Sequence, residues 1–154
     1  MVSGRIKDAR NLAGYSQQAL AKRLQTPQAI ISNYESGKAW PLVDRLIDIA
    51  DACHVHPAWL LTGAGDMNTT GRVVTDISAD GIKNRIVMAR VAAGLPYAEI
   101  ARRSDISLES LRRWELAVNV PRLDMLVKYA EGVGCDAAWL ILGVGPSPLK
   151  EVAS

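Results

Sequence analysis

The sequence lacks phenylalanine, has few other aromatic residues, and carries only two cysteines and little net charge. Four Trp and four Tyr are the aromatic residues among 154, so the core must consist mainly of Ala, Leu, Ile and Val. Cys53 and Cys135 are too few for a disulfide scaffold, and we expect a reduced, cytoplasmic protein. The net charge of +2 excludes a polybasic tail but allows a local basic face.

Long hydrophobic runs are also absent. No apolar segment approaches the roughly 18 residues that a membrane span needs, and residues 1–10 contain no signal-peptide core. Hydrophobic residues make up 49% of the chain and charged residues 22%, which is typical of a globular protein that buries a core. We therefore expect a protein without a membrane partner.

What the sequence does have is an internal repeat, which appears when the chain is shifted by 80 residues against itself. The alignment needs no gaps. Identical pairs include Arg5/Arg85, Ile6/Ile86, Arg10/Arg90, Gly14/Gly94, Ala21/Ala101, Glu35/Glu115, Pro41/Pro121, Leu46/Leu126, Trp59/Trp139 and Leu60/Leu140. We conclude that the chain is a duplicated unit of roughly 65 residues.

The duplication divides the chain into two predicted domains, at residues 1–66 and 81–146. Residues 67–80 between them are mostly polar and form the predicted linker, for which a short extended piece around Arg72–Thr75 is a possibility. Residues 147–154 are predicted to be a flexible tail.

Each copy is predicted to form five short helices. In the first copy we expect Ser3 to cap a helix with Ile6, Ala9, Leu12 and Ala13 inward, and Ser16 to cap Gln17–Leu24. Three further helices start at Pro27, Pro41 and Pro57, and Gly37 ends the one from Pro27. The helices of the second copy are expected near Gly81–Ala93, Tyr97–Ser104, Ser107–Leu116, Pro121–Gly132 and Asp136–Leu142.

Two short helices joined by a tight turn have the spacing of a helix-turn-helix. The residues themselves resemble the Cro/lambda-repressor (XRE-type) family of helix-turn-helix domains. The resemblance is carried in the first copy by Ser16-Gln17-Gln18, Leu20-Ala21, Ile31-Ser32, Tyr34-Glu35, Gly37-Lys38 and Trp59-Leu60-Leu61-Thr62-Gly63, and in the second by Ile100-Ala101, Leu111, Trp114-Glu115, Pro121 and Trp139-Leu140. It implies an all-α fold of two tandem five-helix lambda-repressor-like domains.

The resemblance also implies that the third helix of the first copy lies in the major groove of DNA. Its early outward residues are Gln28, Ala29, Ser32 and Asn33. Gln and Asn pair with adenine through two hydrogen bonds, Ser bonds either kind of base, and Ala contacts the thymine methyl group. The alternative is an ordinary polar helix face, although such a face more often carries Lys and Glu.

Two further residues of the first copy are candidates for phosphate contacts. Gln17 stands at the N-terminus of the second helix, where it is placed to bond a phosphate and to support the recognition helix. Lys38 follows the recognition helix. Lys22 and Arg23 are weaker candidates, and Trp40 is expected to cover the core rather than to contact DNA.

The second copy departs from the family pattern. Its matching helix face carries Leu108, Glu109, Arg112 and Arg113, and Leu116-Ala117-Val118 replaces Ser36-Gly37-Lys38. Arg112 or Arg113 is suited to bond guanine, whereas Glu109 repels phosphates and the exposed leucines favour a protein partner. The second copy is therefore expected either to bind DNA or to form a dimer interface.

Other groups of residues are expected to have structural roles. Arg10 with Glu35, and Arg90 with Glu115, match an ion pair that the family uses to tie its first helix to its third. Cys53, His54 and His56 have no matching ligand set in the second copy, so no metal site is expected. The chain has only these two histidines, and neither belongs to a nucleophile–histidine–acid set. We therefore expect no enzyme activity and no cofactor.

The sequence thus predicts a sequence-specific regulator that binds duplex DNA, most similar to a phage or prophage repressor, and expected to form a homodimer. An alternative remains open, because the helix-turn-helix fold also occurs in proteins that bind other proteins, such as antirepressors, antitoxins and phage-encoded inhibitors.

Overall fold

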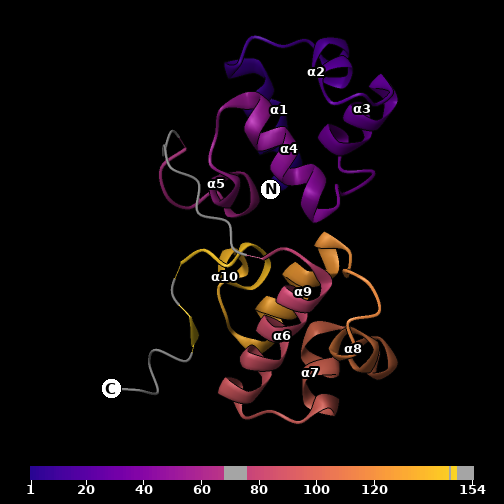
Figure 1. The fold of residues 1–154 in the computed structure, drawn as a ribbon, viewed down its shortest axis with the longest axis vertical. Coiled ribbons are helices and arrows are strands. Elements are labelled where there is room, and N and C mark those ends of the chain that lie inside the picture. Colours follow the sequence, from indigo (N-terminus) through magenta and orange to yellow (C-terminus); the bar gives the residue numbers. More distant parts are fainter. Residues whose placement is uncertain (68–75, 146, 149–154) are drawn as a thin grey trace. The chain divides into compact units, whose positions relative to one another are not determined.

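The computed structural model describes residues 1–67, 76–145 and 147–148, and within these ranges the regular secondary structure is entirely helical. The chain divides into two compact units, assigned to residues 1–72 (unit 1) and 73–154 (unit 2). The described residues of each unit form five helices, whose arrangement can be followed in Figure 1. The expected extended piece around Arg72–Thr75, and all of the tail except Ser147 and Pro148, lie outside the described residues.

Unit 1 begins with α1 and closes with the short helix α5. Its helices are α1 (Val2–Leu12), α2 (Gln17–Arg23), α3 (Gln28–Ser36), α4 (Val43–Cys53) and α5 (Pro57–Thr62). The helix α1 packs against α3, α4 and α5, while α2 packs against α3. Within this unit, α3 is therefore supported by two helices.

Unit 2 repeats the same order of helices. They are α6 (Ala79–Ala93), α7 (Tyr97–Ser104), α8 (Leu108–Glu115), α9 (Leu123–Val133) and α10 (Ala137–Leu142). The extent of the contacts between helices differs from that in unit 1. The contact of α7 with α9 is more extensive than that between any other two described helices.

Both cores include one buried aliphatic residue from each helix at matching positions. In unit 1 the five residues are wholly buried: Ile6, Leu20, Ile31, Leu46 and Leu60. Their partners 80 residues later are equally inaccessible: Ile86, Ile100, Leu111, Leu126 and Leu140. A fully buried side chain of this size stabilises the fold by about 1.5–3 kcal/mol, so the repeated positions account for the shared fold.

Most helices begin and end within two residues of their predicted bounds. Differences of this size are expected, because a capping residue is only half inside its helix. Ser107 was predicted as a first residue and is a cap instead, accepting a hydrogen bond from the backbone N–H of Ser110. Similarly, Pro27 precedes α3, and α4 begins two residues after Pro41. Asp136, with which the last predicted range begins, caps α10 as expected and accepts from the N–H of Ala138. The cap predicted at Ser16 is confirmed, because its Oγ accepts a bond from the N–H of Ala19.

The prediction for the start of α1 is wrong. The helix begins at Val2, no side chain caps it, and Ser3 lies inside its first turn. The inward position of Leu12 is also wrong, since this side chain is 68% exposed. At 3.6 residues per turn, Leu12 stands about 120° around the helix from Ile6, which is the centre of the buried stripe.

Candidate nucleic-acid interface

The α2–turn–α3 segment of unit 1 forms a compact helix-turn-helix. Leu20 and Ala21 on α2 and Ile31 on α3 are buried and fix the two helices against the core. The turn between them has Gln25 in the left-handed conformation, at φ +56°. Asp105 has φ +55° at the matching position of unit 2, so both turns use the same backbone geometry, as the alignment of the copies predicts.

The predicted contact residues of unit 1 lie on the outer side of α3. Gln28, Ala29 and Ser32 are exposed, and Asn33 is half-buried. Residues 28 and 32, like 29 and 33, are four apart and therefore share one helix face. This face carries short amide, hydroxyl and methyl groups without a charge, a set that matches the hydrogen-bonding groups and methyl groups on base edges in the major groove.

Three helices of unit 1 meet at the buried carboxylate of Glu35. Its Oε2 accepts from Nε of Arg10 at 2.6 Å, and its Oε1 accepts from Nη2 at 3.0 Å. Nε2 of Gln17 donates to Oε1 at 3.3 Å. The side chains of Arg10 and Glu35 are only 10% and 4% exposed, and the hydrogen bond to Glu35 raises the pKa of Arg10.

The predicted ion pair of the first copy is therefore confirmed, and Gln17 joins it. The amide of Gln17 links the start of α2 to the end of α3. Gln17 thus ties the start of α2 to the helix that carries Gln28 and Ser32.

The matching pair in unit 2 is confirmed as well. Nη2 of Arg90 donates to Oε1 of Glu115 at 2.9 Å, with side chains 26% and 12% exposed. Tyr97 takes the place of Gln17: the Arg90 guanidinium lies 4.7 Å from its ring centroid, and hydrogen bonding to Glu115 raises the pKa of Tyr97. An aromatic residue here keeps the link between the helices but offers no amide to a phosphate.

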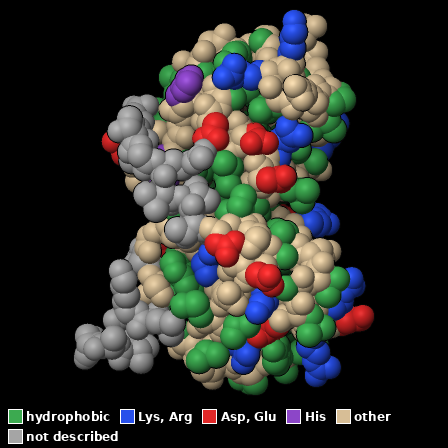
Figure 2. Space-filling model, viewed as in Figure 1, with side chains coloured by type: hydrophobic (Ala, Val, Ile, Leu, Met, Phe, Trp, Pro, Cys, Tyr) green, Lys and Arg blue, Asp and Glu red, His purple; other side chains and the backbone are tan. Residues whose placement is uncertain are grey.

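The cations near the unit 1 interface are exposed. Lys38 follows Gly37, whose φ of +82° ends α3 as predicted. Lys22 and Arg23 are exposed at the end of α2. Figure 2 shows basic and acidic side chains interspersed on the visible face of each unit, and the described residues on this face form no continuous basic stripe.

In unit 2, α8 presents a different surface. Arg112 and Arg113 are exposed, as is Glu109, while Leu108 is 36%, Leu116 73% and Val118 63% exposed. Ala117 adopts φ +54° where unit 1 has Gly37. This conformation costs an alanine roughly 1 kcal/mol relative to glycine, and α8 ends at Glu115.

Sequence reasoning missed one pair of anchoring residues. Nε of Arg5 donates to the carbonyl oxygen of Leu60 at 2.9 Å, and Nη2 to that of Leu61 at 2.6 Å. Arg85 makes the same two bonds to Leu140 and Ile141, at 2.7 and 3.1 Å. Both arginines thus hold the first helix of their unit to the last one, and their identity across the repeat was the signal that could have indicated them.

The two histidines stand at helix ends, and the thiols of the two cysteines are affected by burial. Nδ1 of His56 accepts from the N–H of Ala58 at the start of α5, and His54 ends α4 at φ +59°. Burial raises the pKa of Cys53 to about 11 and that of Cys135 to about 12. Within the described residues, no three His, Cys, Asp or Glu side chains lie close enough to hold a metal ion.

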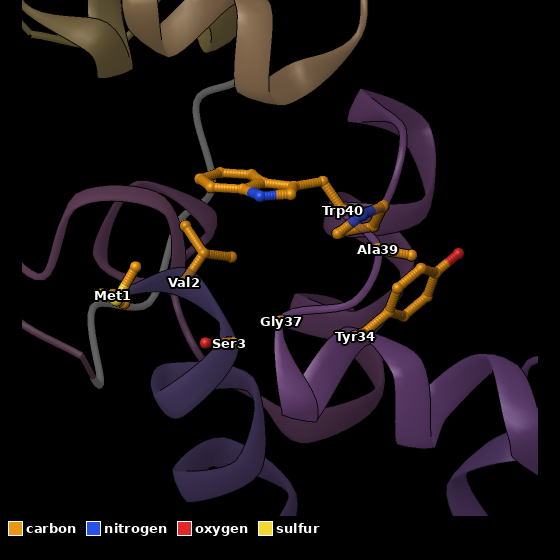
Figure 3. Close-up of a pocket in the computed structure, with 8 residues that line it drawn as sticks. Met1, Val2, Ser3, Tyr34, Gly37, Ala39 and Trp40 are labelled. Carbon is orange, nitrogen blue, oxygen red and sulfur yellow. The ribbon is translucent and has the colours of Figure 1, made fainter.

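Trp40 borders a small pocket in unit 1, shown in Figure 3. Val2 and Tyr34 line it together with Trp40, and its volume is about 50 Å³. That volume admits a few water molecules and is far below the roughly 300 Å³ of the smallest ordinary ligand pockets. Trp40 is half-buried here, at the edge of the unit 1 core.

Comparison with known proteins assigns both halves of the chain to one family. A family model described as helix-turn-helix matches residues 6–60 and again residues 86–140. The two matches are offset by 80 residues, the same spacing as the internal repeat, and they run from the first to the last helix of each unit. No solved structure matches the chain significantly. No helix in the described ranges combines the length and apolarity needed to cross a bilayer.

Proposed function

This chain belongs to the helix-turn-helix family of DNA-binding regulators, and from that premise we propose that it recognises a specific duplex sequence as a repressor of the phage or prophage type. The observation that carries the proposal is the outer face of α3, where Gln28, Ala29 and Ser32 are exposed and uncharged. Without a positive charge these side chains gain less from the phosphates than Lys or Arg does, and they match groups on base edges, so they favour sequence recognition over general affinity.

In the proposed complex, α3 enters the major groove. Gln28 and Asn33 pair with adenines, Ser32 bonds a neighbouring base, and Ala29 contacts a thymine methyl group. Gln17 and Lys38 bond phosphates on either side, which fixes the register of α3 on the duplex. Occupation of a promoter by the protein then blocks transcription.

Two arrangements on DNA are compatible with this proposal. In one, Arg112 or Arg113 of unit 2 bonds guanine, so that a single chain contacts two unlike half-sites. In the other, unit 2 joins two chains into a homodimer, whose half-sites lie about 34 Å apart in a palindrome.

The test removes the two amides from α3. Gln28→Ala/Asn33→Ala is expected to weaken binding to a duplex selected from a random pool by roughly 5- to 150-fold for each lost contact. Binding to an unrelated duplex of the same length should change little. The measurement is fluorescence anisotropy with both duplexes at one salt concentration.

The matched control is Asn11→Ala/Asn84→Ala, which removes two exposed amides from α1 and α6. It should bind like the parent protein. Unchanged discrimination in Gln28→Ala/Asn33→Ala would refute the assignment of α3 as the helix that recognises the sequence.

A second candidate function is regulation through protein contacts, as in antirepressors or antitoxins. It is favoured by the exposure of Leu116 and Val118, 73% and 63%, beside α8. A regulator of this kind would enrich no sequence from a random duplex pool.

A further inference from the structure

Unit 1 contains an open hollow of about 350 Å³ between the C-terminal end of α2 and α4. Its volume lies within the range of roughly 300–1,000 Å³ that is usual for small-molecule sites. Arg23, Arg45 and Asp48 bring charged groups to its lining, and Leu24 and Ala52 contribute apolar surface. No residue of α3 lines it, so the hollow is separate from the helix face that we propose to recognise bases.

The hollow exists because α2 and α4 do not close on each other. In unit 2 the matching helices come together where Gly132 faces Ser104, since a Cβ added at Gly132 would lie 2.8 Å from the Cβ of Ser104. The same two positions in unit 1 hold Ala52 and Leu24, whose larger side chains prevent that approach. Among the described helices of unit 1, α2 therefore packs extensively on α3 alone.

One arginine joins the two sides of the hollow. Nη1 of Arg45, in the first turn of α4, donates to the carbonyl oxygen of Leu24, the residue that caps α2, at 3.0 Å. Met125 occupies the matching position in unit 2 and has no donor for such a bond. A guanidinium carries five N–H donors, so Arg45 keeps donors for a ligand.

Two opposite charges border the hollow without pairing. Arg23 on α2 and Asp48 on α4 are exposed, and neither side chain forms an ion pair or hydrogen bond with another described residue. In unit 2, Arg103 replaces Arg23 but bonds Glu99 at 2.9 Å, and Lys128 replaces Asp48. Of the two units, only unit 1 thus has an unpaired cation and an unpaired anion here, within the described residues.

We propose that this hollow binds a small aliphatic zwitterion of the amino-acid class. Its carboxylate accepts hydrogen bonds from Arg23 and Arg45, and its ammonium group donates to Asp48. A zwitterion is attracted by both signs of charge, whereas a simple anion or cation is attracted by one and repelled by the other. Asp51 also borders the hollow, which further disfavours a ligand that is only anionic. The site goes beyond the proposed function and does not depend on it.

The test is a titration of the isotope-labelled full chain followed by NMR. The probes are glycine, β-alanine, γ-aminobutyrate and ε-aminohexanoate, which carry the same two charges at increasing separation. We expect at least one of them to cause saturable shifts in the backbone amide signals of residues 23–25 and 45–52, which line or flank the hollow. Sodium acetate and methylammonium chloride, which each supply one of the charges, should bind more weakly.

Two variants test the assigned contacts. Arg23→Gln and Asp48→Asn each remove one unpaired charge, and each should raise the dissociation constant of the bound probe by roughly 10-fold or more, as expected for a lost hydrogen bond between charged groups. Arg103→Gln and Lys128→Gln make the matching changes in unit 2 and serve as controls. Both controls should bind the probe like the parent protein.

Three results would overturn the inference: no saturable shift with any of the zwitterions, equal affinity for acetate and the zwitterions, or unchanged binding in Arg23→Gln and Asp48→Asn. If the chain selects a duplex sequence but binds no probe, this inference alone fails. If it binds a probe at the hollow and enriches no duplex, the site stands and the proposed function is refuted.

Discussion

At the scale of single residues, matching positions in the two copies distinguish the side chains that hold the fold from the side chains that are available for recognition. Two arginines that are identical in both copies make the same contacts, since Arg5 and Arg85 both bond carbonyl groups of the last helix of their unit. The outer positions of α3 and α8 differ throughout: Gln28/Leu108, Ala29/Glu109, Ser32/Arg112 and Asn33/Arg113. The contrast indicates that the fold constrains the first set and does not constrain the second.

The buried ion pair of unit 1 gives a prediction at this scale. Arg10→Gln leaves the carboxylate of Glu35, 4% exposed, without its main partner. Because an unpaired buried charge is costly, the free energy of unfolding should fall by about 3 kcal/mol. Arg90→Gln should cost less, since the side chains of Arg90 and Glu115 are more exposed.

Urea unfolding followed by circular dichroism measures both losses. Lys7→Gln is the control, because it removes an exposed cation from the same helix. Equal losses for Arg10→Gln and Arg90→Gln, or none for either, would contradict the role assigned to burial.

At the scale of helices, the extensive contact of α7 with α9 depends on a missing side chain. A Cβ added at Gly132 on α9 would lie 2.8 Å from Cβ of Ser104 and 3.1 Å from its backbone nitrogen, at the end of α7. Unit 1 has Ala52 at the matching position. The two units therefore share an order of helices but not the distance between the second and fourth.

Gly132→Ala is expected to destabilise unit 2 by about 1–3 kcal/mol, as overpacking does, although alanine favours a helix. The loss would appear as a lower midpoint of thermal unfolding. As a control, Gly4→Ala places the same side chain in α1, where no atom other than those of its chain neighbours and its own helix backbone lies within 4 Å. This variant should be as stable as the parent protein or more stable. A stabilised Gly132→Ala protein would show that α7 and α9 are further apart than described.

The sequence was sufficient to predict the number, order and type of the helices. Apolar periodicity, capping residues and left-handed stops are local signals, and the repeat gave two independent examples of each. It did not predict the bonds from Arg5 to Leu60 and Leu61, because they join residues 55 and 56 positions apart. Nor did it predict the close approach of Gly132 on α9 to Ser104 on α7, which likewise depends on tertiary packing.

At the scale of the whole molecule, the two matches to the helix-turn-helix model make this chain a tandem of two related units. We propose that unit 1 recognises the sequence, and that unit 2 either contacts DNA as well or joins two chains. A chain built in this way does not need a strongly basic composition, which is consistent with its net charge of +2. The affinity should consequently be moderate and depend on salt.

The most direct test of the central claim is selection of duplexes from a random pool by the purified full chain, at about 150 mM salt. We predict enrichment of one short sequence. It would occur as a palindrome if two chains present α3 to the same site, and as two unlike half-sites if α8 also contacts bases. A retained pool without enriched sequence would contradict the claim that this protein recognises specific DNA.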